Sequence, residues 1–175
     1  TKNTDIQPEI VAGVSAGATV ACLALSGKTK EGLSYFKKIS KENDKNVYLS
    51  NFFRNAPVFP HYHMYRDMVL QTTDQNTLNI LKNGPELRFL IARPPRWLGP
   101  RSATLVGILA YSIEKKLAYP MHPTFASKLG FSPLVVSIQE CSTPEDLADL
   151  LIQSSCTPPF VPVLWRNNRP TLDGG

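Results

Sequence analysis

Apolar residues along this chain of 175 residues recur with two spacings, one typical of strands and one typical of helices. Short apolar runs bounded by Gly, Pro or Asn predict strands at residues 9–14, 86–92 and 134–138, with a shorter one at 163–165. Apolar residues three and four positions apart predict helices at residues 16–25, 30–43, 61–72, 75–83, 102–116 and 144–153. Strands that alternate with helices favour an α/β fold with a mostly parallel sheet, in a single domain over residues 1–175.

Capping residues and prolines support these boundaries. Asp74 and Thr143 each precede a predicted helix, Ser102 stands at the start of another, and each of the three can cap its helix. Prolines predict loops at residues 93–100, 119–132 and 154–162, and the pair Asn167-Asn168 predicts a turn. The helix over residues 16–25 is apolar nearly all round, so we expect it to be buried against the sheet. The apolar face of the helix over residues 102–116 is formed by Leu105, Ile108, Leu109 and Ile113.

The net charge changes this picture little. The chain carries 19 Lys and Arg against 14 Asp and Glu, a formal charge of +5, and the basic residues are scattered. Without a basic stripe or a known motif, nucleic acid is not expected as a partner, whereas attraction to an anionic membrane surface stays open. No run of about 18 apolar residues predicts a membrane span.

The three cysteines, Cys22, Cys141 and Cys156, show no CxxC spacing and form neither a disulfide framework nor a zinc site. They favour a reducing compartment such as the cytoplasm. No acidic cluster indicates a calcium or other metal site, and no cofactor is expected. Because the chain begins at Thr1 without Met, we expect it to be a segment of a longer protein.

Chemistry is concentrated at Gly13-Val14-Ser15-Ala16-Gly17, between the first strand and the first helix. Gly-x-Ser-x-Gly at a strand-to-helix turn is typical of serine hydrolases. Glycines two residues before and after the serine would let neighbouring backbone approach closely. The following helix directs its N-terminus at the serine, where developing negative charge is stabilised.

A serine hydroxyl needs a base, and the sequence offers two arrangements. One is a triad with a histidine, of which the chain has His61, His63 and His122. In the order serine, acid, histidine, Asp67 or Asp74 could be the acid between Ser15 and His122. The other is a dyad with Asp173 of Asp173-Gly174-Gly175, where the glycines allow a tight backbone turn beside the carboxylate.

Three motifs in order resemble the patatin-like phospholipase family. Residues 13–18 resemble its nucleophile turn, and residues 152–162 (Ile-Gln-Ser-Ser-Cys-Thr-Pro-Pro-Phe-Val-Pro) resemble its Ala-Ser-x-Ala-x-Pro-x-x-Phe-x-Pro segment. Thr171-Leu172-Asp173-Gly174-Gly175 resembles its Asp-Gly-Gly/Ala acid motif. The resemblance extends from Glu9 to the end of the chain, and the middle is matched by its pattern of elements.

The resemblance implies a three-layer α/β/α fold, here incomplete at the N-terminus, that hydrolyses acyl esters of phospholipids or other lipids. It implies Ser15 as the nucleophile and Asp173 as the base, with an acyl-enzyme formed on Ser15 and no histidine required. The family also has a glycine-rich oxyanion loop, Gly-Gly-Gly-x-Arg/Lys-Gly, upstream of its serine. The fourteen residues before Ser15 contain no such loop, which leaves the N–H of Ala16 as one oxyanion donor.

Three hypotheses for the function follow. The first is a lipid acyl hydrolase, and the alternative is a catalytically impaired patatin-like domain that binds lipid or protein. The third is a His-dependent esterase. If the polypeptide is only this long, we expect weak or no activity. The aromatic stretch expected to line an acyl groove comprises Phe52, Phe53, Val58, Phe59, Tyr62, Met64 and Tyr65. The loop over residues 93–101, with Arg96 and Trp97, is expected to touch a lipid headgroup surface.

Overall fold

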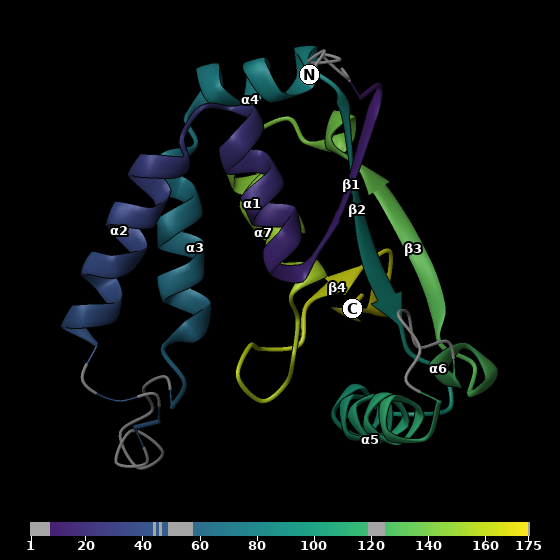
Figure 1. The fold of residues 1–175 in the computed structure, drawn as a ribbon. Coiled ribbons are helices and arrows are strands. Elements are labelled where there is room, and N and C mark those ends of the chain that lie inside the picture. Colours follow the sequence, from purple (N-terminus) through teal and green to yellow (C-terminus); the bar gives the residue numbers. More distant parts are fainter. Residues whose placement is uncertain (1–7, 44, 46, 49–57, 119–124, 175) are drawn as a thin grey trace, which may run out of the picture.

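The fold is built around strand β2 (Glu86–Arg93), which pairs with three other strands. The computed structural model describes residues 8–43, 45, 47–48, 58–118 and 125–174. Strand β1 (Ile10–Val14) runs parallel to β2, whereas β3 (Ser132–Ser137) runs antiparallel to it (Figure 1). Strand β6 (Leu172–Asp173) is also antiparallel to β2. This α/β sheet is therefore mixed, and the prediction of a mostly parallel sheet is wrong.

One face of the sheet carries the core. Along β2 the side chains of Leu87, Phe89 and Ile91 are fully buried, while Arg88 and Leu90 between them are only half-buried. This alternation is typical of a strand that is covered on one side. Helices α1, α4 and α7 contact the sheet, and in Figure 1 α2 and α3 lie farther out on the same side as α1.

Helix boundaries agree with the predicted ones to within one or two residues for the five helices on this side. They are α1 (Ser15–Leu25), α2 (Thr29–Glu42), α3 (His61–Thr72), α4 (Gln75–Asn83) and α7 (Pro144–Ser154). The Asp74 side chain caps α4 by accepting from the Thr77 N–H at 2.7 Å. Thr143 and Asp146 form a reciprocal capping box at α7. Leu147, Leu150 and Leu151 of α7 are buried, as its apolar spacing predicts.

Helix α1 differs from its prediction. Ala18, Thr19 and Cys22 are buried against the sheet and α7, but Ala16, Gly17, Val20 and Ala24 are exposed. The expectation of burial all round is therefore wrong for one side of α1.

The segment between β2 and β3 also differs from its prediction. Helix α5 (Pro100–Ala118) begins two residues earlier than predicted, so Ser102 lies inside it and is not its cap. A short helix, α6 (Phe125–Lys128), occurs where a loop was predicted. Strand β3 ends at Ser137, and Ile138–Glu140 form a 3-10 turn. None of the described helices has the length and apolar character needed to cross a bilayer.

The C-terminal part forms a hairpin before it returns to the main sheet. Strands β4 (Trp165–Arg166) and β5 (Arg169–Pro170) pair antiparallel across Asn167 and Asn168, whose φ angles are +51° and +54°. Two left-handed residues in a two-residue loop fit the twist of a hairpin, and Asn tolerates this conformation. The predicted turn is confirmed. Most of the irregular stretch predicted at residues 46–59 lies outside the described residues.

Strands β1 and β6 meet end to end along one edge of β2. Strand β3 pairs with residues 88–93 of β2 along the opposite edge of β2. Strand β1 pairs with β2 as far as Val14 opposite Leu90, and β6 pairs with the next positions, with Asp173 opposite Ile91. Since β6 is antiparallel to β2, its end points toward the end of β1. The residues that follow Val14 and those around Asp173 are thereby placed side by side.

Candidate active site

Ser15 occupies the turn between β1 and α1 and is half-buried. Its φ of +51° lies in the left-handed region that residues with a side chain seldom adopt. Such a conformation is maintained only when its surroundings hold it, and it occurs often at functional sites. The strained turn expected from Gly-x-Ser-x-Gly is thus present in the backbone.

The two glycines of this turn have different roles. A Cβ on Gly13 would lie 2.6 Å from the Ala18 Cα, so only glycine lets α1 pack this closely on β1. A Cβ on Gly17 would meet nothing within 4 Å. The expectation that both glycines serve close backbone approach therefore holds for Gly13 and not for Gly17, which borders open space two residues after Ser15.

Ser15 and Asp173 are joined by a hydrogen bond. The Ser15 hydroxyl donates to Oδ2 of Asp173 at 2.7 Å, and both side chains are half-buried. The backbone holds Asp173 in place, because its N–H donates to the Cys156 carbonyl at 2.8 Å. A carboxylate that accepts this proton directly has the geometry required of a general base.

Ser154, at the end of α7, connects the two halves of the site. Its fully buried hydroxyl donates to the Leu90 carbonyl at 2.7 Å and accepts from the Ser15 N–H at 3.1 Å. The Ser154 carbonyl in turn accepts from the Gly174 N–H at 3.4 Å. The sequence did not single out this residue, because its function depends on three strands and a helix meeting at one point.

Gly174 packs tightly at the same point. A Cβ on Gly174 would lie 2.6 Å from the Leu90 carbonyl oxygen and 3.0 Å from Cγ2 of Val14. The absence of a side chain therefore lets the acid motif reach β2 and the end of β1. Gly175, the last residue of that motif, lies outside the described residues.

The N-terminus of α1 faces the site without a capping side chain. The Ser15 N–H is already bonded to Ser154, whereas the N–H of Ala16 belongs to the uncapped first turn. N–H groups at a helix start, together with the helix dipole, favour negative charge nearby. The oxyanion role expected of the Ala16 N–H stays a prediction, and its position in the first turn of α1 supports it.

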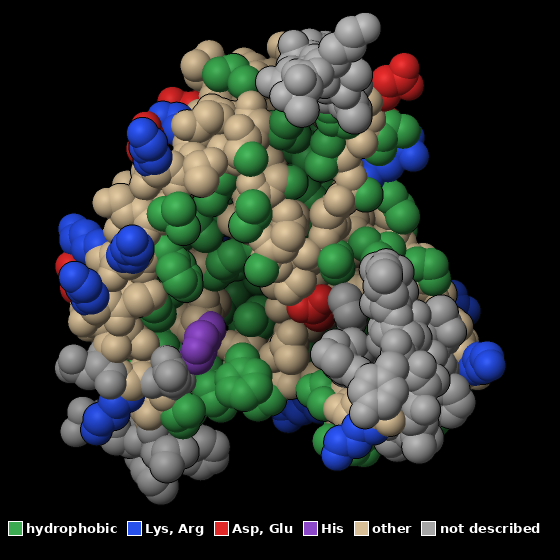
Figure 2. Space-filling model, viewed as in Figure 1, with side chains coloured by type: hydrophobic (Ala, Val, Ile, Leu, Met, Phe, Trp, Pro, Cys, Tyr) green, Lys and Arg blue, Asp and Glu red, His purple; other side chains and the backbone are tan. Residues whose placement is uncertain are grey.

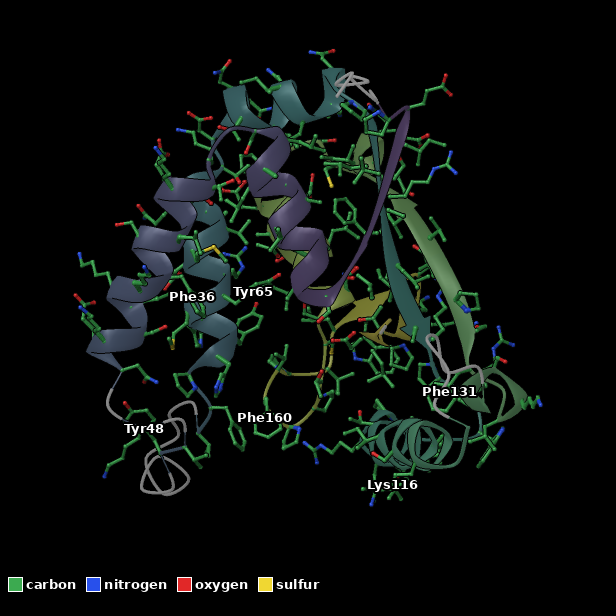
Figure 3. The ribbon with its side chains drawn as sticks, viewed as in Figure 1. Phe36, Tyr48, Tyr65, Lys116, Phe131 and Phe160 are labelled. Carbon is green, nitrogen blue, oxygen red and sulfur yellow. The ribbon has the colours of Figure 1, made fainter. Side chains whose placement is uncertain are left out.

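Tyr65 of α3 extends toward the start of α1 (Figure 3). Its hydroxyl is hydrogen-bonded to that of Thr19, one turn after Ser15. Burial raises the pKa of Tyr65, and the hydrogen bond to Thr19 only partly opposes this. Tyr65 thus stays protonated and fixes the distance between α3 and the nucleophile helix.

Apolar side chains lie on the face of the molecule seen in Figure 1. Figure 2 shows hydrophobic side chains gathered across the centre of this face. The Phe160 ring, in the segment after α7, contacts the rings of Phe59 and His61 edge to face, with centroids 5.2 and 6.0 Å apart. Of the aromatic stretch expected to line an acyl groove, Phe52 and Phe53 lie outside the described residues, and the rest is half-buried.

The described histidines do not contact Ser15. His61 packs on Phe160, and His63 packs on the ring of Tyr62 at 5.1 Å. His122 lies outside the described residues, so the triad that includes it stays untested. Asp74 is engaged as the cap of α4, and Asp67 is exposed on α3.

The cysteines are poor candidates for nucleophiles. All three are free and buried, and burial raises the pKa of Cys22 to about 12 and that of Cys141 to about 11. A thiol with such a pKa carries almost no thiolate at neutral pH. Among the described residues, no group of His, Cys, Asp or Glu is arranged to hold a metal ion.

A scan against protein-family models matches one family, described as patatin-like phospholipase, over residues 1–175. The chain belongs to the patatin-like phospholipase family. Searches of the curated proteins and of the solved structures found no match. Patatin-like phospholipases generally hydrolyse lipid esters, so membership assigns this chain to a family of lipid hydrolases.

Proposed function

We propose that this chain is the catalytic part of a lipid acyl hydrolase in which Ser15 and Asp173 form a dyad. The observation that carries the proposal is the 2.7 Å hydrogen bond from the Ser15 hydroxyl to Oδ2 of Asp173. The left-handed conformation of Ser15 and the uncapped N-terminus of α1 beside it support the same assignment.

In the proposed reaction, Oγ of Ser15 attacks the carbonyl carbon of a lipid ester while Asp173 accepts its proton. The tetrahedral oxyanion is stabilised by the N–H of Ala16 and the α1 dipole. The C–O bond to the alcohol breaks, the alcohol leaves with the proton from Asp173, and an ester remains on Ser15. Asp173 then deprotonates a water, which attacks this ester. The bond between the acyl carbon and Oγ breaks, Asp173 returns the proton to Oγ of Ser15, and the fatty acid is released.

The test compares variants on a soluble p-nitrophenyl fatty-acid ester. Ser15→Ala should reduce hydrolysis to background, and Asp173→Asn should lower kcat by about 10²–10⁴-fold because the general base is lost. Asp67→Asn makes the same change on an exposed part of α3 and should leave the rate unchanged. If Asp173→Asn retains the full rate, or if His122→Ala alone abolishes it, the dyad is refuted.

The alternative, a catalytically impaired domain that binds lipid or protein, follows from the same site. In the described residues the visible oxyanion donors are the N–H groups at the start of α1, and loss of one such donor costs about 10²–10³-fold in rate. A fluorophosphonate probe separates the two readings. Covalent labelling of Ser15 that disappears in Asp173→Asn supports the hydrolase, whereas no labelling of an intact, folded chain supports the impaired domain.

The proposed substrate is a phospholipid or another acyl lipid, and such molecules are presented in bilayers or micelles. Peripheral contact with a membrane surface is therefore part of the proposal. Arg96 and Trp97, the two residues expected at that surface, are both exposed. The three-layer arrangement implied by the resemblance remains a prediction, since the described helices that contact the sheet bury one face of it.

A further inference from the structure

Helix α5 packs in an unusual way. Its inward positions include small residues: Ala103 is fully buried and Ala110 is 4% exposed. Gly107 is half-buried, and a Cβ added to it would lie 3.8 Å from the Phe131 ring. Its large apolar side chains face outward: Leu105 is 61% exposed, Ile108 49% and Leu109 51%. Of the predicted apolar face, Leu105, Ile108 and Leu109 are thus turned away from the protein, and the side chain of Ile113 lies outside the described part of the chain. A soluble helix normally buries that face.

Basic residues frame this exposed face. Arg101 lies four residues before Leu105, and Lys116 lies seven residues after Leu109, so both continue the same stripe of the helix. Both are exposed, and Figure 3 shows Lys116 at the outer side of α5. From Pro94 to Gly130 the chain has five Lys and Arg and one Glu, so most of its net positive charge lies in this segment.

The loop before α5 extends the same surface. Trp97 is 77% exposed, and Arg96 beside it is exposed as well. Arg169 donates to the Pro94 carbonyl at 3.1 Å, and Pro94 and Pro95 are buried, so the loop is anchored where it leaves β2. Exposed Trp, aliphatic side chains and flanking Lys and Arg are the composition of helices that lie in a membrane interface.

The position of α5 suits a lipid substrate. Helix α5 follows the carboxyl end of β2, and Ser15 follows the carboxyl end of β1, which runs parallel to β2 (Figure 1). Both therefore lie at the same end of the sheet. A helix that rests on a bilayer there would keep the reactive serine near the lipid surface.

We propose that α5 and the loop before it form an interfacial anchor that binds anionic phospholipid bilayers. The anchor comprises Arg96, Trp97, Arg101, Leu105, Ile108, Leu109 and Lys116. The apolar residues enter the boundary between headgroups and acyl chains, and the cations pair with lipid phosphates. This inference rests on the proposed function for its biological purpose, but bilayer binding is measured without catalysis.

The binding test uses the whole chain carrying Ser15→Ala, which removes hydrolysis as a complication. The protein is floated with phosphatidylcholine vesicles that contain about 30% of the anionic lipid phosphatidylglycerol. We expect to recover it in the lipid fraction. Trp97→Ala with Leu109→Ser should weaken binding about tenfold or more, because two apolar side chains that would enter the bilayer are lost. Arg96→Gln with Arg101→Gln should weaken it about fivefold for each charge removed at low salt.

Matched controls exist elsewhere on the surface. Trp165 of β4 is 60% exposed and Leu33 of α2 is 54% exposed, so Trp165→Ala with Leu33→Ser makes the same chemical change outside the anchor. This control pair should bind vesicles as the parent does. All variants should hydrolyse a soluble ester at the parent rate when Ser15 is present, which separates failure of the anchor from failure of the catalytic proposal.

Fluorescence tests the orientation directly, since the chain has two tryptophans. In Trp165→Phe the remaining Trp97 should shift its emission to the blue on vesicles and be quenched by brominated lipid. In Trp97→Phe the emission of Trp165 should not change. The proposal is overturned if brominated lipid does not quench Trp97, or if Trp97→Ala with Leu109→Ser binds vesicles as tightly as the control pair. It is also overturned if that variant only converts a dimer to a monomer, because this face would then be a contact between copies of the chain.

Discussion

At the scale of single residues, the site depends on Ser154 as much as on the pair that carries the chemistry. Its hydroxyl bonds the Ser15 N–H and the Leu90 carbonyl at once, in a fully buried position. Buried polar groups that lose a partner cost free energy and also allow movement. The left-handed turn at Ser15 therefore relies on this bridge to keep its geometry.

Ser154→Ala is expected to lower kcat on a soluble ester by about 10–100-fold, because a nucleophile displaced by a fraction of an ångström reacts poorly. The free energy of unfolding should fall by about 1–3 kcal/mol, since the Ser15 N–H and the Leu90 carbonyl, both in part-buried hydrogen bonds, lose their partner. Steady-state kinetics and urea unfolding measure the two effects. Ser26→Ala removes a hydroxyl that bonds only within α1, and equal kcat losses in both variants would contradict a specific role for Ser154.

The sequence identified Ser15 and Asp173 because each stands in a short motif with a chemical reason for its glycines. It did not identify Ser154, because a serine at a helix end has many ordinary explanations. Nor could it distinguish the two glycines around Ser15, since the difference lies in the distance to the backbone of Ala18.

At the scale of elements, the contact between α1 and β1 sets the position of the nucleophile. This contact is close only at Gly13, while Gly17 borders open space. The two glycines of one motif therefore offer a matched pair of substitutions.

Gly13→Ala should lower the melting temperature, because the new methyl group meets the Ala18 backbone and overpacking costs about 1–3 kcal/mol. Gly17→Ala should leave stability unchanged or raise it by up to about 1 kcal/mol, because alanine favours the helix. Calorimetry of both variants checks this. Equal destabilisation by both would show that the packing of α1 on β1 is not as close as the structure has it.

Helices were predicted more accurately than the sheet for a physical reason. Apolar spacing and caps such as Asp74 and Thr143 act within a few residues, so the sequence alone is enough to predict them. Strand direction depends on where the chain returns after α5 and α6, and β3 returns antiparallel. The apolar stripe of α5 was also predicted from the sequence. Its orientation relative to the rest of the protein was not, because the small residues Ala103, Gly107 and Ala110 form the side of α5 that packs inward.

At the scale of the whole molecule, buried thiols make stability depend on pH. The pKa of Cys22 is raised by burial to about 12, above the ordinary value of 9.0 that the thiol has in the unfolded chain. The folded thiol stays neutral while the unfolded one ionises, so stability is fully present below pH 9 and declines as the pH rises toward 12.

Between pH 8 and pH 10 the Cys22 thiol alone should lower the free energy of unfolding by about 1 kcal/mol. Urea unfolding under reducing conditions at both pH values measures the decline. In Cys22→Ala the decline should be smaller by that amount, whatever the stability of the variant at pH 8. An identical decline in the two proteins would show that this thiol does not govern the alkaline limit.

The end-to-end meeting of β1 and β6 along β2 has a consequence for how activity arises during folding. Ser15 and Asp173 are separated by 158 positions, so their contact closes a loop of nearly the whole chain. Contacts of such high sequence separation are slow to form and cannot exist in a locally folded fragment. The dyad is therefore assembled only when the chain has completed its topology, and the reactivity of Ser15 reports on completed folding as directly as any spectroscopic signal.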